Sequence, residues 1–330
     1  MALRETSVLV TGASGFLGGA LALHLAAMGV RVRALVRRPE KAAFLPGSVE
    51  IVTGDLLDPA ALRAAAQGCD IIFHCAAALG GDLTMQRRIN VDGTLLLAEN
   101  AAQVGVRRLI HVSTLSVYGV MYEGVIDEET PFAPGSDPYG ITKAEAEASL
   151  RSRAGAHGLD YTIIRPGMIY GARAGLWTGT LFRLARIKPM PWFGDGSSLA
   201  HCIHVDDVID LMLCAAEHPQ AAGEAFNCVM SPAPTWRAFL GEYARLAYDE
   251  SDEWLELPRW PLYAIAGIGM LLSPPVSRGR MLPDFVRFLQ RRVQFSMTKA
   301  RDRLGWEPQV DLETGVARCA DWLRAEGLLT

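Results

Sequence analysis

One glycine-rich stretch, Thr11-Gly12-Ala13-Ser14-Gly15-Phe16-Leu17-Gly18, decides the fold of this chain of 330 residues. It follows an apolar run, Ser7–Thr11, and leads into an Ala- and Leu-rich segment, Phe16–Met28, which predicts a strand, a tight turn and a helix. Three glycines allow the turn, the close approach of a pyrophosphate to the backbone, and close packing of the helix on the strand. The free N–H groups at the start of the helix favour phosphate. We therefore predict a dinucleotide-binding loop whose cofactor contacts are Gly12, Ser14, Gly15, Phe16, Leu17 and Gly18.

Short apolar runs and longer helical segments alternate through the first two-thirds of the chain. The predicted strands are Ser7–Thr11, Arg31–Val36, Glu50–Thr53, Ile71–Cys75, Arg108–Ser113 and Tyr161–Arg165. The predicted helices are Phe16–Met28, Pro59–Gln67, Asn90–Val104 and Tyr139–Arg153. Nearly continuous apolar strands are typical of a parallel sheet that is covered on both faces. The sequence thus predicts an α/β fold, a doubly wound parallel sheet (Rossmann fold) with its ligand crevice at the C-terminal ends of the strands.

The alternation ends after Gly171, where the chain becomes richer in Pro and Trp. We predict a dinucleotide-binding domain over residues 1–171. Residues 172–330 are expected to form mainly a smaller, mostly helical substrate-binding lobe, with residues 194–227 returning to the main sheet.

Composition and charge argue against several classes of protein. The net charge of −4 offers no basic excess for nucleic acid. The six cysteines form no CxxC pair and no metal-ligand spacing, so we expect buried thiols in a reducing compartment and no metal site. No signal-peptide pattern follows Met1, and the longest apolar run, Trp260–Leu272, is too short to span a membrane. A cytoplasmic protein is expected.

The residues after the second and third predicted strands bear on the choice of cofactor. NAD enzymes usually carry a carboxylate about 20 residues after the glycine-rich loop, where it binds the ribose 2′-hydroxyl. Here the second strand leads into Arg37 and Arg38, which either bind a 2′-phosphate or are solvated surface charges. We therefore favour NADP as the cofactor, with NAD as the alternative. After the third strand, Asp55 is placed to accept a hydrogen bond from the adenine amino group, with Leu56 beside it.

A candidate acid/base pair opens the last predicted helix of the first domain. Tyr139 and Lys143 are four residues apart and therefore lie on one face of that helix. The ordinary pKa of tyrosine is about 10, and a neighbouring ammonium together with an oxidised nicotinamide favours the phenolate. Upstream, a predicted strand ends in hydroxyl residues, of which Thr114 or Ser113 can hydrogen-bond the reacting oxygen. The predicted catalytic residues are Thr114, Tyr139 and Lys143.

Together these motifs resemble the extended short-chain dehydrogenase/reductase superfamily, the NAD-dependent epimerase/dehydratase family that includes nucleotide-sugar epimerases and 3β-hydroxysteroid dehydrogenases. The resemblance covers nearly the whole chain, in the segments Thr11–Gly18, His74–Ala77, Asn90–Thr94, Ser113–Thr114, Tyr139–Lys143, Arg165–Gly167, Tyr170–Gly171, His204–Val208 and Leu304–Pro308. It implies that Thr114 is the catalytic hydroxyl and that Lys143 binds the nicotinamide ribose. It also implies that Ala76, Ala77 and Pro166 line the cofactor.

A few positions separate the branches of this superfamily. Dehydratases carry an Asp-Glu pair after the catalytic hydroxyl, where this chain has Leu115 and Ser116. Nucleotide-sugar epimerases typically carry an arginine where this chain has Ala200 and an asparagine where it has Met168. Apolar side chains instead indicate either a hydrophobic substrate pocket or simply core. The expected substrate residues are Met121, Met168, Trp177 and Trp192.

We therefore expect the branch of hydroxysteroid dehydrogenases and dihydroflavonol reductases, which interconverts a secondary alcohol and a ketone on a hydrophobic ring-type molecule. Two alternatives stay open. A nucleotide-sugar epimerase would retain NAD and re-reduce its own product. A non-enzymatic NADP sensor would need no acid/base pair, whereas this chain keeps one.

The remaining expectations concern partners. Members of the superfamily often dimerise through the helices that correspond to Asn90–Val104 and Tyr139–Arg153, so a homodimer is expected. Three interpretations fit the basic and apolar segment Arg278–Arg301. The segment could contact a membrane surface, or Arg278 or Arg280 could bind an anionic group of the substrate. Alternatively, the segment forms a helix of the substrate lobe with a solvated basic face. We favour the last interpretation.

Overall fold

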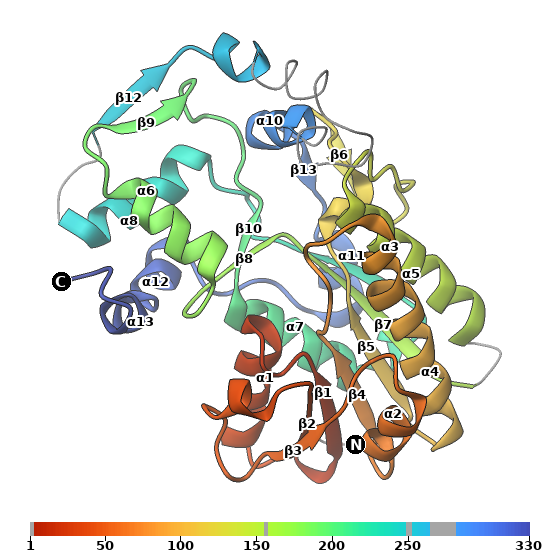
Figure 1. Cartoon of the computed structure of the whole chain (residues 1–330). Coiled ribbons are helices and arrows are strands. Elements are labelled where there is room, and N and C mark those ends of the chain that lie inside the picture. The colour runs from red at the N-terminus through yellow and green to blue at the C-terminus, as the bar shows by residue number, and fades with distance from the viewer. Residues whose placement is uncertain (1–2, 155–157, 249–252, 265–281) are drawn as a thin grey trace.

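The computed structural model describes residues 3–154, 158–248, 253–264 and 282–330 (Figure 1). Within these ranges the main sheet has seven parallel strands in the order β11-β7-β5-β4-β1-β2-β3. They are β1 (Ser7–Thr11), β2 (Arg31–Val36), β3 (Glu50–Thr53), β4 (Ile71–His74), β5 (Arg108–Val112), β7 (Asp160–Pro166) and β11 (Ala225–Cys228). The chain runs from β1 outward to β3 and then crosses back to β4, so the strand order reverses between β1 and β4. The predicted doubly wound parallel sheet is confirmed.

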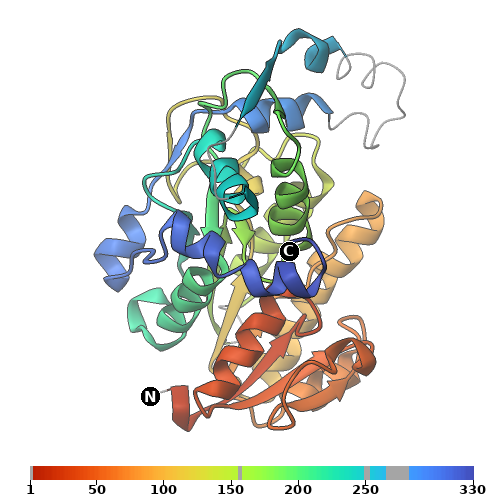
Figure 2. The ribbon, with the colours of Figure 1, turned by 90° about the vertical axis from the view of Figure 1, so that its left-hand side faces the viewer.

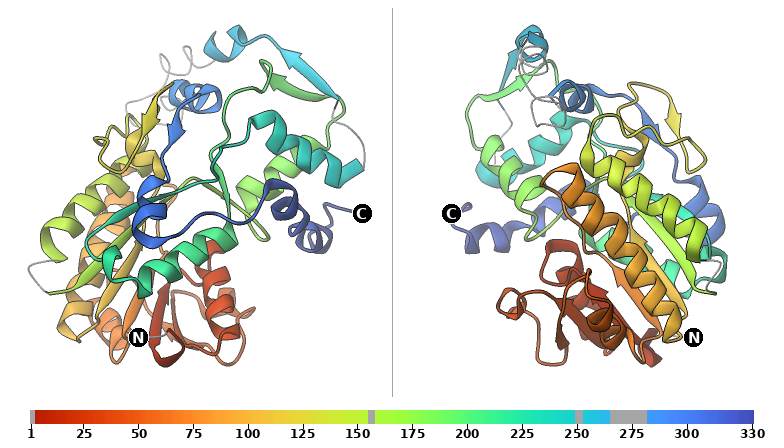
Figure 3. Two further views of the ribbon diagram at one scale, coloured as in Figure 1. Left: turned by 180° about the vertical axis from the view of Figure 1, so that it is seen from behind. Right: turned by 45° about the vertical axis from the view of Figure 1, so that its right-hand side comes forward.

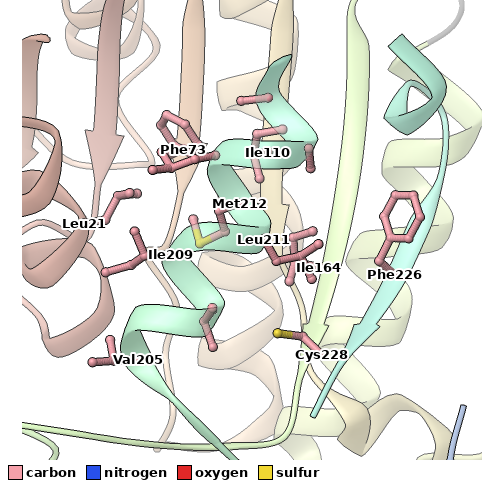
Figure 4. Close-up of a cluster of buried hydrophobic side chains, with 14 of the residues drawn as sticks. Leu21, Phe73, Ile110, Ile164, Val205, Ile209, Leu211, Met212, Phe226 and Cys228 are labelled. Carbon is pink, nitrogen blue, oxygen red and sulfur yellow. The ribbon is translucent and has the colours of Figure 1, made fainter. Parts of the chain in front are cut away.

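Helices cover both faces of this sheet (Figure 3). One face carries α1 (Phe16–Ala27) and α7 (Val205–Glu217), and the other carries α2 (Pro59–Ala66), α4 (Gly93–Gln103) and α5 (Pro138–Ala154). Successive side chains of a strand point to opposite faces. Along β1, Val8 and Val10 therefore pack in one hydrophobic cluster, and Leu9 packs in the other. Figure 4 shows how α7 lays its apolar side chains, among them Met212, against the first face.

One predicted helix begins earlier than expected. The segment Asn90–Val104 is preceded by α3 (Leu83–Arg87), and a π-helical turn (Arg88–Asp92) joins α3 to α4. Asp82 begins α3 by accepting a hydrogen bond from the Met85 N–H at 2.7 Å. The prediction relied on the pattern of apolar residues, which does not show that Asp82 caps a helix, and so it missed the earlier start.

The second lobe, whose backbone Figure 2 shows, has a separate core that is rich in aromatic side chains. Trp236, Phe239 and Tyr243 from one helix are completely buried there. Two short parallel pairs contribute to this lobe, β8 (Met168–Tyr170) with β10 (Cys202–His204) and β9 (Met190–Phe193) with β12 (Trp254–Leu257). Its helices include α6 (Leu181–Ala185), α8 (Trp236–Tyr248), α12 (Leu312–Ala317) and α13 (Ala320–Ala325).

A late segment returns to the end of the main sheet near α5. It contains α10 (Leu282–Gln290), β13 (Gln294–Phe295), which pairs with β6 (Val125–Ile126), and α11 (Thr298–Leu304). The Ser136 hydroxyl donates a hydrogen bond to Asp284 of α10 at 2.7 Å, so α10 packs on the loop that leads into α5. Among the described helices, none is long and apolar enough to cross a membrane.

Two left-handed glycines give a test of the tight turn after β1. Gly12 (φ +72) leaves no room for a side chain, because an added Cβ would lie 2.7 Å from the Ala76 nitrogen. Gly29 (φ +79) has nothing within 4 Å of such an atom. We expect Gly29→Ala to cost about 1–2 kcal/mol of unfolding free energy from backbone strain alone. Gly12→Ala should cost more, roughly 3 kcal/mol or above, because backbone must also move. Urea unfolding of both variants measures this difference, and equal losses would show that the turn is not tightly packed.

Candidate active site

The glycine-rich loop forms a compact turn at the C-terminal end of β1. The Gly15 N–H donates to the Gly12 carbonyl at 2.9 Å, and α1 begins at Phe16 without a side-chain cap. A Cβ atom at Gly18 would lie 2.5 Å from the Gly12 carbonyl oxygen, so only glycine permits this contact between helix and loop. The N–H groups of the first turn of α1 are thus not consumed by a capping side chain. They are available to an anion, as the sequence predicts.

A buried hydrogen-bond chain connects this loop to the next strand. The Ala76 N–H donates to the Thr11 hydroxyl at 3.3 Å, and that hydroxyl contacts His74 Nδ1 at 2.7 Å. His74 Nε2 contacts the Thr94 hydroxyl at 2.9 Å, and that hydroxyl donates to the Asn90 carbonyl at 2.7 Å. Because the Thr94 proton is already used, His74 must donate from Nε2 and accept at Nδ1. Burial, followed by the charge of Lys143, lowers the pKa of His74 to about 3, so the ring is neutral and structural.

Asn90 joins the cofactor side of the site to the catalytic helix. Its side chain accepts from the Ala78 N–H at 2.7 Å and donates both to the Ala78 carbonyl and to the Thr142 hydroxyl, each at 3.0 Å. Thr142 in turn donates to the carbonyl of Tyr139 at 3.1 Å. The loop after β4 and the first turn of α5 are therefore held together by one buried amide. The family motif contains Asn90, but its role was not predicted.

The first turn of α5 carries the predicted acid/base pair. Asp137 stabilises this turn by accepting from the Tyr139 N–H at 3.1 Å and from the Gly140 N–H at 3.0 Å. Burial, and then the carboxylate of Asp137, raise the pKa of the Tyr139 phenol above its ordinary value. Lys143 is only 1% exposed, and burial lowers the pKa of its ammonium to about 8. Its Nζ contacts His111 Nε2 at 3.1 Å, a partner that was not predicted.

The hydroxyl residues after β5 differ in their surroundings. Thr114 is half-buried and caps the 3-10 helix η4 (Leu115–Tyr118) by accepting from the Ser116 N–H at 3.2 Å. Its own hydroxyl donates to the Ser116 hydroxyl at 3.3 Å. Ser113 is buried, and its hydroxyl has no partner among the described residues. Thr114 is thus the more accessible of the two candidates.

A buried ion pair anchors α5 to the sheet. Arg165 of β7 donates from Nη2 to Glu147 of α5 at 2.7 Å and from Nε to both carboxylate oxygens, and neither side chain is more than 1% exposed. From Nη1, Arg165 also donates to the Tyr118 hydroxyl at 2.5 Å. Tyr118 in turn donates to the Asn227 side chain at 2.8 Å. Helix α5, η4 and two strands of the sheet are therefore tied together by one network.

The other predicted cofactor residues lie at the same edge of the sheet. Arg37 follows β2 and is exposed. After β3, Asp55 accepts from the Leu57 N–H at 2.9 Å, and Leu56 is buried. Ala76 and Ala77 follow β4, and Pro166 is the last residue of β7. Because parallel strands end together, the fold gathers these residues although they are far apart in the sequence.

The four predicted substrate residues fall into two groups. Met168 and Trp192 are buried in the core of the second lobe, and the Trp192 ring lies 5.4 Å from that of Trp236. Their described contacts are those of packing residues. Trp177 is half-buried beside Phe288 of α10, and Met121 is exposed.

The basic segment Arg278–Arg301 is not uniformly solvated, which corrects the favoured interpretation at one position. Arg291 is 4% exposed and packs its guanidinium over the rings of Phe288 and Phe295, and its Nε has no hydrogen-bond partner among the described residues. Burial lowers its pKa to about 9, so it stays charged at neutral pH. By contrast, Arg287 is largely exposed and pairs with Asp284. Arg278, Arg280 and residues 265–272 of the long apolar run lie outside the described residues.

Comparisons with known proteins identify the family of this chain. A model of the NAD dependent epimerase/dehydratase family matches residues 8–228. Sterol demethylase protein B of Methylococcus capsulatus is 40% identical over 346 residues, which cover 98% of this chain and 100% of that protein. 3beta-hydroxysteroid-dehydrogenase/decarboxylase isoform 1 of Arabidopsis thaliana is 30% identical over 357 residues, which cover 96% of this chain and 79% of that protein.

A solved structure is similar over the same length. The UDP-glucose 4-epimerase of Thermotoga maritima, crystallised with UDP-glucose, is 25% identical, covers 97% of this chain and 99% of its own, and superposes with a TM-score of 0.74. The family model spans more than half of the chain, and the similarity to the two curated relatives covers 96% and 98% of this chain. The chain therefore belongs to the NAD dependent epimerase/dehydratase family, within the extended short-chain dehydrogenase/reductase superfamily, and is an NAD(P)-dependent enzyme.

Proposed function

We propose that this enzyme interconverts a secondary alcohol and a ketone on a hydrophobic ring-type substrate, with Tyr139 as the acid/base. The observation that carries the proposal is the Asn90 side chain, which hydrogen-bonds both the loop after β4 and Thr142 in the first turn of α5. Through it the predicted nicotinamide side of the cofactor site and the Tyr139 turn share one rigid support. Rigid alignment of a proton-transfer group with a hydride acceptor is the main contribution that a protein makes to such a reaction.

The proton steps follow from the surroundings of three side chains. The raised pKa of Tyr139 keeps the phenol protonated at neutral pH, which suits proton donation to a ketone. In the oxidative direction the hydroxyl proton passes to the phenolate, and Lys143, four residues later on the same face of α5, supplies the positive charge that favours this phenolate. Thr114 hydrogen-bonds the reacting oxygen in either direction. A bound nicotinamide supplies or accepts the hydride.

The substrate class rests on what surrounds the motif at His204. Ala200 is completely buried and Met168 lies in the core, so neither of these positions offers the polar anchor that an epimerase uses for a diphosphate. The two curated relatives described above carry names that refer to sterols or hydroxysteroids. We therefore favour a polycyclic alcohol over a nucleotide sugar. We also propose NADP as the preferred cofactor, a cytoplasmic location, and a homodimer formed through α4 and α5, which lie side by side on one face of the sheet (Figure 3).

Arg291 favours a more specific candidate, a substrate with an acidic group beside the alcohol. Phe295 packs in the cluster of the main sheet and Phe288 against the core of the second lobe, so Arg291 lies at the junction of the two units. Substrate sites are common at such junctions, and a buried guanidinium whose Nε has no partner among the described residues suits a carboxylate. One relative is named a dehydrogenase/decarboxylase.

The chemistry of such a substrate is balanced without a further reactant. Oxidation of a hydroxyl β to a carboxylate would give a β-keto acid, with the hydroxyl proton on Tyr139, and a bound nicotinamide would take up the hydride. The bond to the carboxyl carbon then breaks and CO₂ leaves. The electron pair of the broken bond stays on the substrate and forms an enolate. The enolate carbon takes up the proton, so the net products are ketone, CO₂ and reduced cofactor.

Removing the phenol tests the catalytic assignment. We expect Tyr139→Phe to lower kcat by about 10²–10⁴-fold, because general acid/base catalysis contributes that much. The Kd of NADP should change little, since the ring and the fold are kept. Turnover is followed by reduced-nicotinamide absorbance with a panel of 3β-hydroxysteroids. Wild-type turnover in Tyr139→Phe would refute the assignment.

The bound nucleotide separates the dehydrogenase from the epimerase and tests Arg37. We expect purified protein to release no nucleotide on denaturation and then to bind NADP more tightly than NAD. Arg37→Ala should weaken NADP binding by roughly 10–100-fold, the value of a charge-assisted contact, and leave NAD binding unchanged. Arg31→Ala, exposed at the opposite end of β2, is the matched control. One tightly held NAD per chain would favour the epimerase.

Arg291→Met tests for an acidic substrate. With a 3β-hydroxysteroid that carries a 4-carboxylate, we expect KM to rise roughly 10–100-fold, because a hydrogen bond to a charged group is lost. KM for the uncarboxylated alcohol should not change. The ligand-free variant should unfold at a higher temperature, because an incompletely paired buried charge has been removed. Arg287→Met, on the exposed side of α10, should change none of these quantities. Equal KM changes for both substrates would count against a carboxylate contact.

A further inference from the structure

The contact between Lys143 and His111 joins the catalytic helix to the middle of the sheet. Lys143 Nζ lies 3.1 Å from Nε2 of His111, and both side chains are buried. His111 belongs to β5 and precedes Thr114 by three residues. Within the described part of the chain, it is the only hydrogen-bond partner of the Lys143 ammonium.

The direction of this hydrogen bond follows from the charges nearby. Burial, then Lys143 and then His74 lower the pKa of His111 well below its ordinary value, so the ring is neutral. The ammonium therefore donates and Nε2 accepts, which puts the ring proton on Nδ1. In the described residues Nδ1 has no partner. A buried imidazole is thus kept with one nitrogen unpaired while the other serves Lys143.

The remaining groups around Lys143 do not replace this acceptor. Glu147, one turn later on α5, raises the pKa of Lys143 through its charge, but its oxygens accept hydrogen bonds from Arg165. Cys75, after β4, raises that pKa more weakly. His74 has both ring nitrogens bonded to threonine hydroxyls. Among the described residues, only His111 accepts a hydrogen bond from the ammonium.

We propose that His111 is a positioning residue, which accepts a hydrogen bond from the charged form of Lys143 and thereby keeps that ammonium in place and protonated for cofactor binding and proton transfer. The inference rests on the proposed function, because Lys143 matters only if it serves the nicotinamide ribose and Tyr139. His111 acts through Lys143, because no contact of its side chain requires it to touch the substrate. In consequence, His111 sets the upper pH limit of the enzyme.

The pH dependence follows with a defined sign. The pKa of Lys143 is about 8, so its proton, and with it activity in the oxidative direction, is lost as the pH rises through this value. Without an acceptor, the buried ammonium is less stable, and its pKa falls further. We expect the alkaline limit of kcat/KM to move down by about one to two pH units in His111→Phe, the size of one lost hydrogen bond to a charged group. His111→Gln keeps an acceptor and should retain most of the wild-type limit.

Nucleotide binding provides a readout that needs no substrate. The Kd of NADP should rise above about pH 8 in the wild type, because the ammonium that hydrogen-bonds the ribose loses its proton. In His111→Phe this rise should begin one to two pH units lower. In Lys143→Met, the rise in this pH range should be absent. Thermal unfolding of each ligand-free variant reports whether the fold is kept. Should His111→Phe not fold, His111→Leu tests the same expectation.

The outcomes separate this inference from the proposed function. Loss of turnover in Tyr139→Phe together with a lower pH limit in His111→Phe, restored by His111→Gln, is the expected result. An unshifted limit in His111→Phe, with Tyr139→Phe inactive, would overturn the role of His111 alone. Equal losses at every pH in the Phe and Gln variants would assign His111 to packing and also overturn it. An active Tyr139→Phe would instead overturn the proposed function.

Discussion

The buried ion pair between Arg165 and Glu147 is the interaction on which the site depends. It fixes α5 against β7 by three short contacts, and Arg165 extends the same hydrogen-bond network to Tyr118 and Asn227. Two buried charges tolerate burial only when each is fully hydrogen-bonded, and loss of either partner leaves the other uncompensated at a cost of about 3–5 kcal/mol. This penalty makes the position of α5 close to unique. Tyr139 and Lys143 are fixed in position as well, because they lie on the same helix.

A second set of contacts fixes α5 from its other end. Asn90 connects the first turn of α5 to the loop after β4, and His74 connects that loop to β1. Each group in this hydrogen-bond chain has a defined role as donor or acceptor, because the hydroxyl proton of each threonine is already used in one hydrogen bond. The turn that we expect to hold the cofactor and the helix that carries the acid/base are thus parts of one rigid unit. Rigid support of this kind is what hydride transfer between two bound molecules requires.

Lys143 and Arg291 are two buried cations that are incompletely paired within the described residues. Lys143 has a single neutral partner, and the Nε of Arg291 has none within the described ranges. Proteins rarely bury such charges without a compensating group, because desolvation is costly. Both lie where we expect ligands, Lys143 near the end of β4 and Arg291 at the junction of sheet and lobe. Their incomplete pairing is the physical reason for treating them as binding groups rather than as packing.

The sequence by itself determined the parallel sheet, the turn after β1 and the spacing of Tyr139 and Lys143. Each of these is a local pattern, in which apolar runs, glycines and a four-residue spacing act within one element. It also identified the family through motifs such as Asn90–Thr94 and Arg165–Gly167. Strand limits were accurate to about one residue for the same reason, since turns and apolar runs are encoded close to where they act.

Only the tertiary structure decided the partners of buried polar groups. His111 and Lys143 are 32 residues apart, and Arg165 and Glu147 are 18 apart, on elements whose neighbours depend on the strand order. The tertiary structure also decided which of the predicted site and surface residues are buried. Arg291 belongs to a run of basic residues in the sequence but is enclosed by aromatic rings in the fold, and Met168 and Trp192 have become core. Exposure is a property of the packed chain, because it depends on which distant segments cover a side chain, and a local pattern does not contain that information.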